Sequence, residues 1–177
     1  AHLPYVRHPE YEDFLEEDWL YEAISETYVP LLQVFYALHA DKVDYHLTIS
    51  FSPTLISMLQ DEMLMNRYVR KLEKLIELTE KELIRTKNDP VFNRLARMYN
   101  EYFLRIHDTF VNRFHCNLIY AFKKLSDMGH LELITSSATH CYLPLARVNE
   151  KAVYAQIKTG VETFKRLKEM APAMPVI

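Results

Sequence analysis

Glycine is almost absent from this chain of 177 residues, which contains only Gly129 and Gly160. Proteins on average contain about 7% glycine, and an α/β barrel normally places glycine in its turns. The shortage therefore favours a helix-rich chain or an incomplete barrel. Cysteine is equally scarce, because only Cys116 and Cys141 occur. Two cysteines provide neither a disulfide framework nor a paired-cysteine zinc site.

Strong net charge and long apolar runs are also missing. The formal net charge is -3 and the pI is near 6.3, which excludes a basic footprint for nucleic acid or an anionic membrane. No apolar run approaches the roughly 20 residues of a membrane-spanning helix, and the first residues do not read as a signal peptide. We therefore expect a cytoplasmic protein. Because the sequence opens at Ala1 without a methionine, we also expect a piece of a longer protein.

Hydrophobic periodicity predicts helices that alternate with two strands. The strands are expected at 45–53 and 131–137, where β-branched and aromatic residues end at a proline or a serine pair. Helix breaks are expected near Val29, because Pro30 follows, at 88–90 and near Asn112. This order favours a parallel sheet into which the helices between the strands are inserted. The helical patterns cover 16–40, 54–60, 63–88, 92–122 and 149–170.

His140 is the first candidate for a functional residue. Active sites of α/β barrels lie at the carboxyl ends of strands, and His140 follows the second predicted strand. The alternative is an ordinary loop histidine that bonds to nearby backbone. His2 opens a proline-containing loop and is a candidate by the same argument. If both histidines face one cavity, a polar ligand such as a carbohydrate ranks above a metal, because no H-E-x-x-H pattern is present.

The aromatic residues have two interpretations. Trp19, the single tryptophan, could stack on a sugar ring, but a lone tryptophan at helical spacing more often packs in a core, and we favour the core. A set of aromatic residues at helical spacing is also expected in the core: Tyr99, Tyr102, Phe103, Phe110 and Phe114.

The basic residues of 67–87 alternate with glutamates and are expected to form a solvated face.

The acidic residues do not form a recognisable catalytic pair. Glu16, Glu17 and Asp18 precede a helical pattern and are expected to complement its dipole. Glu132 alternates with apolar neighbours and is expected to face solvent or a helix. A retaining glycosidase needs two carboxylates about 5 Å apart across the scissile bond. The residues themselves identify no such pair.

Four separated segments resemble glycoside hydrolase family 57, and in particular its α-1,4-glucan branching enzymes. They read "AHLPYVRHPE", "FLEEDWLYEAISETYVPLL", "GHLELITSSATHCYLPL" and "AVYAQIKTGVETFKR". The resemblance implies an α/β fold, an incomplete (β/α)7 barrel with a large helical insertion, and retaining transfer on α-glucans without a metal or organic cofactor. It divides the chain into a first barrel part at 1–53, the insertion at 54–128, and a strand, active-site loop and helix at 129–177.

The same resemblance assigns roles to three residues. His2 matches the second histidine of the family's His-x-His-Leu-Pro segment, and His140 matches the histidine at the end of the third barrel strand. Both are expected to contact the sugar at the cleavage subsite, with Trp19 nearby. The family's nucleophilic glutamate, in a Trp-Leu-Pro-Glu segment, and its acid/base aspartate are not in this sequence and are expected beyond Ile177. A chain without either carboxylate is expected to show no turnover.

Three alternatives remain beside the branching enzyme. An α-amylase or a 4-α-glucanotransferase of the same family would differ in the acceptor, which is water or a 4-hydroxyl group. A non-catalytic module would bind glucan, or would bind a partner through the helices of 63–125. A metal-dependent hydrolase would use His2 and His140 as ligands. The expected substrates in the leading hypothesis are amylose, glycogen and maltooligosaccharides.

Overall fold

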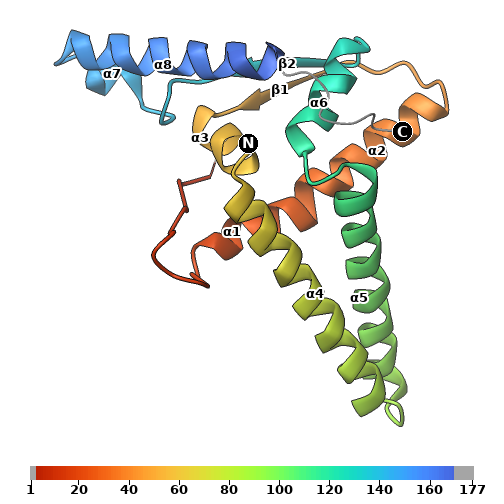
Figure 1. The fold of residues 1–177 in the computed structure, drawn as a ribbon. Helices are drawn as coiled ribbons and strands as arrows, with labels where there is room; N and C mark the ends of the chain where they lie inside the picture. The colour runs from red at the N-terminus through yellow and green to blue at the C-terminus, as the bar shows by residue number, and fades with distance from the viewer. Residues whose placement is uncertain (1–2, 170–177) are drawn as a thin grey trace.

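The computed structural model describes residues 3–169. Two short strands lie among α3, α6 and α8 at one end of the molecule, and a long α4–α5 hairpin extends from this body (Figure 1). His2 lies outside the described residues. In chain order the elements are α1 Glu17–Ala23, the π-helix η1 Ile24–Tyr28, α2 Val29–Ala40, β1 Leu47–Phe51, α3 Pro53–Leu59, α4 Glu62–Arg85, α5 Pro90–Asp108, the π-helix η2 Thr109–Arg113, α6 Leu118–Asp127, β2 Leu131–Thr135, α7 Leu143–Ala146 and α8 Glu150–Glu169.

The two strands pair in parallel, as their alternation with helices predicts. The register runs from Leu47 opposite Leu131 to Phe51 opposite Thr135. On one face, Phe51 packs edge-to-face on Phe122 of α6, with ring centroids 5.1 Å apart. In the described part of the chain, the sheet consists of these two strands alone. The prediction of a parallel sheet with helices inserted between its strands is therefore confirmed.

The other face of the sheet carries exposed side chains. Thr48 donates a hydrogen bond to Glu132 across the strand pair, 2.7 Å between the two oxygens. Ile134 is also exposed on this face. Side chains at alternate positions of a strand point to opposite faces, so the buried Leu131 and Leu133 belong to the face that packs on the core. The expectation that Glu132 faces solvent is confirmed.

The helix that begins at Glu17 passes through a π-helical segment before it continues as α2. Pro30 lies in the first turn of α2, directly after η1. A proline has no N–H to donate to the preceding turn, and π-helical turns accommodate such an interruption within a continuous helix. The predicted restart near Val29 is confirmed, because α2 begins at that residue.

The long helices α4 and α5 form an antiparallel hairpin around a break at 86–89. Asp89 caps α5 by accepting hydrogen bonds from the backbone N–H groups of Val91 and Phe92, both 3.1 Å. The predicted break near Asn112 is also present, because η2 and a turn with left-handed backbone at His115 and Cys116 separate α5 from α6.

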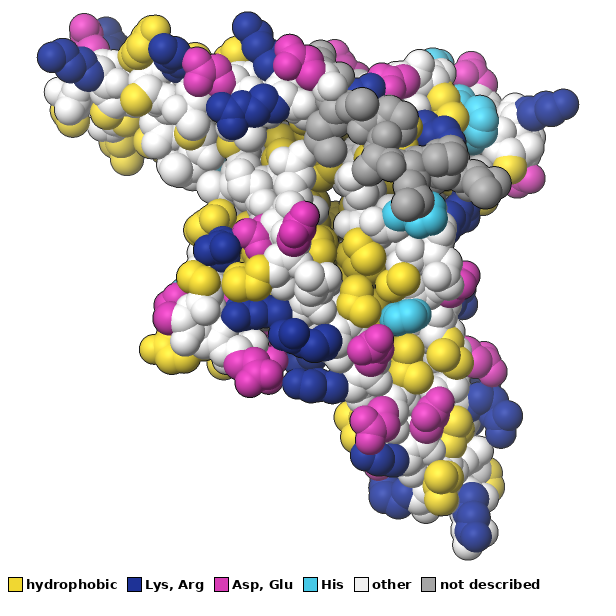
Figure 2. Space-filling view, in the orientation of Figure 1, with side chains coloured by type: hydrophobic (Ala, Val, Ile, Leu, Met, Phe, Trp, Pro, Cys, Tyr) yellow, Lys and Arg dark blue, Asp and Glu magenta, His cyan; other side chains and the backbone are white. Residues whose placement is uncertain are grey.

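The aromatic residues of α5 and η2 are only partly in the core. Phe110 and Phe114 are buried, whereas Tyr99 is half-exposed, so the prediction of a continuous core stripe is wrong for its outer part. The reason is visible in Figure 1, where the outer half of the hairpin stands clear of the other elements. Figure 2 shows hydrophobic side chains on the surface of this hairpin. None of the helices within residues 3–169 is long and apolar enough to cross a membrane.

Candidate functional site

The carboxyl ends of β1 and β2 meet at one edge of the sheet. Thr135 Oγ1 donates a hydrogen bond of 2.8 Å to the carbonyl oxygen of Phe51, which ties the two strand ends together. β1 continues into the buried Ser52, whose Oγ caps α3 by accepting from the N–H of Leu55. β2 continues into the segment 136–142, which contains His140. The predicted position of His140, just beyond a strand end, is therefore confirmed.

Internal hydrogen bonds shape the segment that carries His140. The His140 N–H donates to the carbonyl oxygen of Ser137 at 2.9 Å, and Ser137 Oγ donates to the carbonyl oxygen of Cys141 at 3.1 Å. His140 has a φ of 55°, a left-handed backbone that is uncommon for a residue other than glycine. Such conformations persist where surrounding contacts impose them, and they concentrate at functional sites. The His140 side chain is exposed at this edge.

Helix α8 holds the same segment from outside. The Ala138 N–H donates to the carbonyl oxygen of Gln156 at 2.9 Å, and the Thr139 N–H donates to Gln156 Oε1 at 3.0 Å. Gly160, one turn further along α8, is buried against the segment. A Cβ atom at Gly160 would lie 2.6 Å from the carbonyl oxygen of Ser136. The close approach of α8 to the strand-end segment therefore requires glycine at this position.

Replacing Gly160 with alanine is expected to destabilise the protein. In an open helix this change would be stabilising by up to about 1 kcal/mol, but a methyl group placed 2.6 Å from a backbone oxygen forces α8 away from 136–138. Overpacking of this kind costs about 1–3 kcal/mol. Urea denaturation measures the change, with Thr159→Ala, at an exposed position of α8, as the control. A Gly160→Ala protein at least as stable as the parent would contradict the tight fit.

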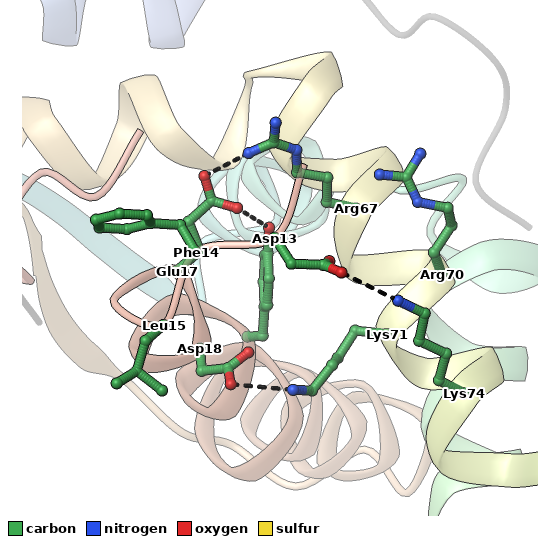
Figure 3. A pocket seen from close by; sticks show the side chains of 10 residues that line it. Asp13, Phe14, Leu15, Glu17, Asp18, Arg67, Arg70, Lys71 and Lys74 are labelled. Atoms are coloured by element: carbon green, nitrogen blue, oxygen red, sulfur yellow. Dashed lines mark hydrogen bonds and ion pairs between the residues drawn. The ribbon is translucent and has the colours of Figure 1, made fainter. Parts of the chain in front are cut away.

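A second concave feature lies where α1 meets α4. It is a hollow of about 330 Å³, and basic and acidic side chains gather beside one another on this side of the molecule (Figure 2). Figure 3 shows that the acidic groups come from the segment 13–18 and the basic groups from α4. The lining residues are Asp13, Phe14, Leu15, Glu17, Asp18, Tyr21, Arg67, Arg70, Lys71 and Lys74.

A buried ion pair forms the floor of this hollow. Glu17 is 1% exposed and Arg67 is 9% exposed, and Arg67 Nη1 lies 2.6 Å from Glu17 Oε1. The guanidinium also donates to the carbonyl oxygens of His8 and Tyr11. Tyr21 Oη donates to Glu17 Oε2 at 2.8 Å. Burial and this contact with a carboxylate raise the pKa of Tyr21 well above its usual range, so Tyr21 stays a hydrogen-bond donor.

Two expectations from the sequence are corrected here. The sequence predicts Arg67 on a solvated face, and this is wrong, because Arg67 is buried and paired with Glu17. Glu17 does lie in the first turn of α1, as expected for a partner of the helix dipole, but its carboxylate is buried in this pair. The available signal was periodicity, since Glu17 shares the helical face of Leu20 and Tyr21. The core assignment of Trp19 is also wrong, because this side chain is 52% exposed. Trp19 lies two positions after Glu17, about 200° around the helix, and therefore points away from the buried face.

The structure does not gather all candidates at one place. Figure 1 separates α1, which carries Trp19, from the 136–142 segment that carries His140, with α3 between them in this view. Among residues 3–169, no three His, Cys, Asp or Glu side chains are grouped so that they could hold a metal ion. Independently of this, the exposed imidazole of His140 can hydrogen-bond a polar ligand at the sheet edge, because an imidazole both donates and accepts.

The chain is similar in sequence and in fold to known proteins. The sequence pattern described as glycosyl hydrolase family 57 matches residues 1–174. The 1,4-alpha-glucan branching enzyme TK1436 of Thermococcus kodakarensis is 37% identical over 172 residues, which are 97% of this chain and 25% of that protein. Its crystal structure, in complex with glucose and additives, is similar with a TM-score of 0.84, at 34% identity over 97% of this chain and 30% of that one.

Two further crystal structures are similar over 97% of this chain. The alpha-amylase AmyC of Thermotoga maritima has a TM-score of 0.88 and 44% identity, and the match covers 32% of that chain. The branching enzyme of Pyrococcus horikoshii has a TM-score of 0.86 and 32% identity, again over 32% of that chain. The chain therefore spans between a quarter and a third of the length of these relatives.

Proposed function

This chain belongs to glycosyl hydrolase family 57, and from that premise we propose that it is the N-terminal part of a 1,4-α-glucan branching enzyme. The parent enzyme would cleave an α-1,4 bond, hold the glycosyl chain on a glutamate and transfer it to a 6-hydroxyl group. The observation that carries the proposal is the 37% identity to a branching enzyme over nearly the whole chain. The substrate class is α-glucan, such as amylose, glycogen or maltooligosaccharides.

In this proposal β1 and β2 are neighbouring strands of an incomplete (β/α)7 barrel. Their parallel pairing supports this placement, as does the exposed second face of the sheet, which a further layer would cover in a barrel. Residues 1–53 would open the barrel, 54–128 would form the helical insertion, and 129–177 would supply a strand, the active-site loop and a helix. The enzyme would work in the cytoplasm, in glycogen metabolism, without a cofactor.

The site residues would bind substrate and would not carry out the bond chemistry. His140, at the carboxyl edge of the sheet, would hydrogen-bond a sugar hydroxyl at the cleavage subsite, together with His2. The exposed indole of Trp19 would stack on a sugar ring further along the glucan chain, because α1 lies apart from the 136–142 segment. The nucleophilic glutamate and the acid/base aspartate would be supplied from beyond Ile177.

A second candidate is an α-amylase of the same family. The specific observation that favours it is the 44% identity to the Thermotoga maritima α-amylase, with a TM-score of 0.88. The two activities differ in whether a glucan hydroxyl or water accepts the glycosyl group.

Incubation of amylose with a longer polypeptide, which carries these residues together with the two carboxylate segments, separates the candidates. A branching enzyme forms α-1,6 linkages, detected by anomeric proton NMR, with few new reducing ends. An α-amylase releases reducing ends and forms no α-1,6 linkages, and that outcome would sink the branching proposal.

Replacing His140 with glutamine in the same polypeptide is expected to lower kcat/KM by about 10-fold to 100-fold. This is the range for losing one or two hydrogen bonds to a substrate, at about 1.4 kcal/mol for each factor of ten. His46→Gln is the matched control, because His46 lies before β1, at the opposite end of the strands. Equal activity of the two variants would remove His140 from the proposed site.

A further inference from the structure

Helix α1 begins without a side-chain N-cap. Glu16 occupies the cap position, but its side chain accepts no hydrogen bond from the first turn. Two acidic residues of that turn instead bind α4, since Glu17 pairs with Arg67 at 2.6 Å and Asp18 pairs with Lys71 at 3.0 Å. Figure 3 shows both pairs bridging α1 and the long helix. The start of α1 is therefore held in place by α4 more than by its own capping.

Arg67 makes the more constraining of the two connections. Its guanidinium reaches the Glu17 carboxylate and also the backbone oxygens of His8 and Tyr11, so it joins three points of the segment 8–17 to α4. The contacts to Glu17 and His8 are 2.6 and 3.1 Å long. Lys71 and Asp18 are about one-third exposed, and such a pair contributes little. Arg67 thus joins more points of the segment 8–17 to α4 than Lys71 does.

Trp19 lies close to the ion pair between Glu17 and Arg67. It lies two residues after Glu17, in the same helical turn, and its indole is on the outer side because Glu17, Leu20 and Tyr21 occupy the buried side. A rigid helical turn transmits the position of Glu17 to Trp19. A shift of this ion pair by about 1 Å would displace the indole by a similar amount, which is enough to weaken a stacking contact.

We propose that Arg67 is a positioning residue, which fixes Trp19 for contact with the glucan through its buried pair with Glu17. This inference rests on the proposed function, because it takes an α-glucan as the ligand of Trp19. It adds that a residue of the helical hairpin, remote from the strand ends, governs part of the glucan-binding surface.

Arg67→Lys is the informative variant. Lysine keeps the positive charge beside Glu17, so the buried carboxylate retains a partner and the fold is preserved. A compact ammonium cannot bind the carboxylate and both backbone oxygens in the forked geometry of a guanidinium. The start of α1 therefore shifts while the protein remains folded, which separates positioning from stability.

The single tryptophan makes the test direct, since intrinsic fluorescence reports on Trp19 alone. Maltoheptaose is titrated into the 177-residue chain at a temperature where circular dichroism shows each variant to be folded. The unsubstituted 177-residue chain is expected to give a saturable change in emission, and Arg67→Lys is expected to raise the Kd for maltoheptaose about tenfold. Lys74→Ala, which removes an exposed ion pair on the same face of α4, is the control and should leave the Kd within about twofold.

The possible outcomes separate the positioning role of Arg67 from glucan binding itself. If the parent binds and Arg67→Lys binds with the same Kd, the positioning role is overturned while the proposed function stands. If calorimetry shows that maltoheptaose binds the parent without a change in emission, Trp19 is not a glucan contact and the positioning role falls with it. If calorimetry detects no binding of maltoheptaose to the unsubstituted 177-residue chain, this chain does not form a glucan-binding surface, and the positioning role of Arg67 is overturned with it.

Discussion

Replacing Arg67 with alanine is expected to lower the free energy of unfolding by about 3–5 kcal/mol, because Glu17 is left charged, buried and without its cationic partner. The loss is larger than the pair's net contribution. It consists mainly of the cost of keeping a lone carboxylate out of water. Urea denaturation followed by circular dichroism measures it, and a protein that unfolds at room temperature would represent the upper end of the range.

Two control variants test whether the unpaired buried charge of Glu17 causes this loss of stability. Lys74→Ala breaks the exposed pair with Asp13, 3.3 Å long, and is expected to cost less than about 1 kcal/mol. The double change Glu17→Leu with Arg67→Met removes both buried charges and is expected to recover most of the lost stability. If Arg67→Ala costs no more than Lys74→Ala, the two residues are not buried in solution as they are in the structure.

Replacing Phe110 with alanine is expected to destabilise the protein by a comparable amount, about 3–5 kcal/mol. Phe110 is completely buried in η2 and packs edge-to-face on Tyr68, with ring centroids 4.8 Å apart. The Tyr68 hydroxyl is hydrogen-bonded to Ser25 Oγ at 2.8 Å, so this contact joins η2 to α4 and η1. The cavity left by the ring would loosen three elements at once.

Phe92→Ala is the matched control for Phe110. Phe92 is 57% exposed near the start of α5, and its truncation leaves no cavity, so a cost below about 0.5 kcal/mol is expected. Thermal unfolding monitored at 222 nm compares the two variants. Equal costs would show that the inner end of the hairpin is not the packed core that the structure places there.

Local sequence signals predicted most of the secondary structure. The strand ending at Phe51, the restart of the helix beside Pro30 and the break before Pro90 all depend on residues that act on their own backbone. Parallel pairing of the strands also followed, because long helical connections separate them. His140 could be placed at the sheet edge for the same reason, from its position after a strand alone.

Features that depend on distant contacts could not be predicted in this way. Arg67 lies 50 residues after Glu17, and periodicity places each on a helical face without saying which element covers that face. A charged residue on a charge-rich helix was therefore assigned to solvent. The exposure of Trp19 depends in turn on which side of α1 meets α4. Gly160 likewise gives no sign in the sequence that a carbonyl oxygen lies against it.

The length of the α4–α5 hairpin is independent of the contacts that its inner end makes with α1. Its outer half is held by its own cross-links, such as Asn93 Nδ2 donating to the Leu83 carbonyl oxygen and Asn100 Nδ2 donating to Thr79 Oγ1, both 3.0 Å. Arg67 and Tyr68 lie at the inner end of α4. Matched turns could be added to or removed from the two helices, changing their length by about 5.4 Å per turn, without disturbing that end. Homologous proteins can therefore differ in hairpin length while keeping one arrangement of α1 and its tryptophan.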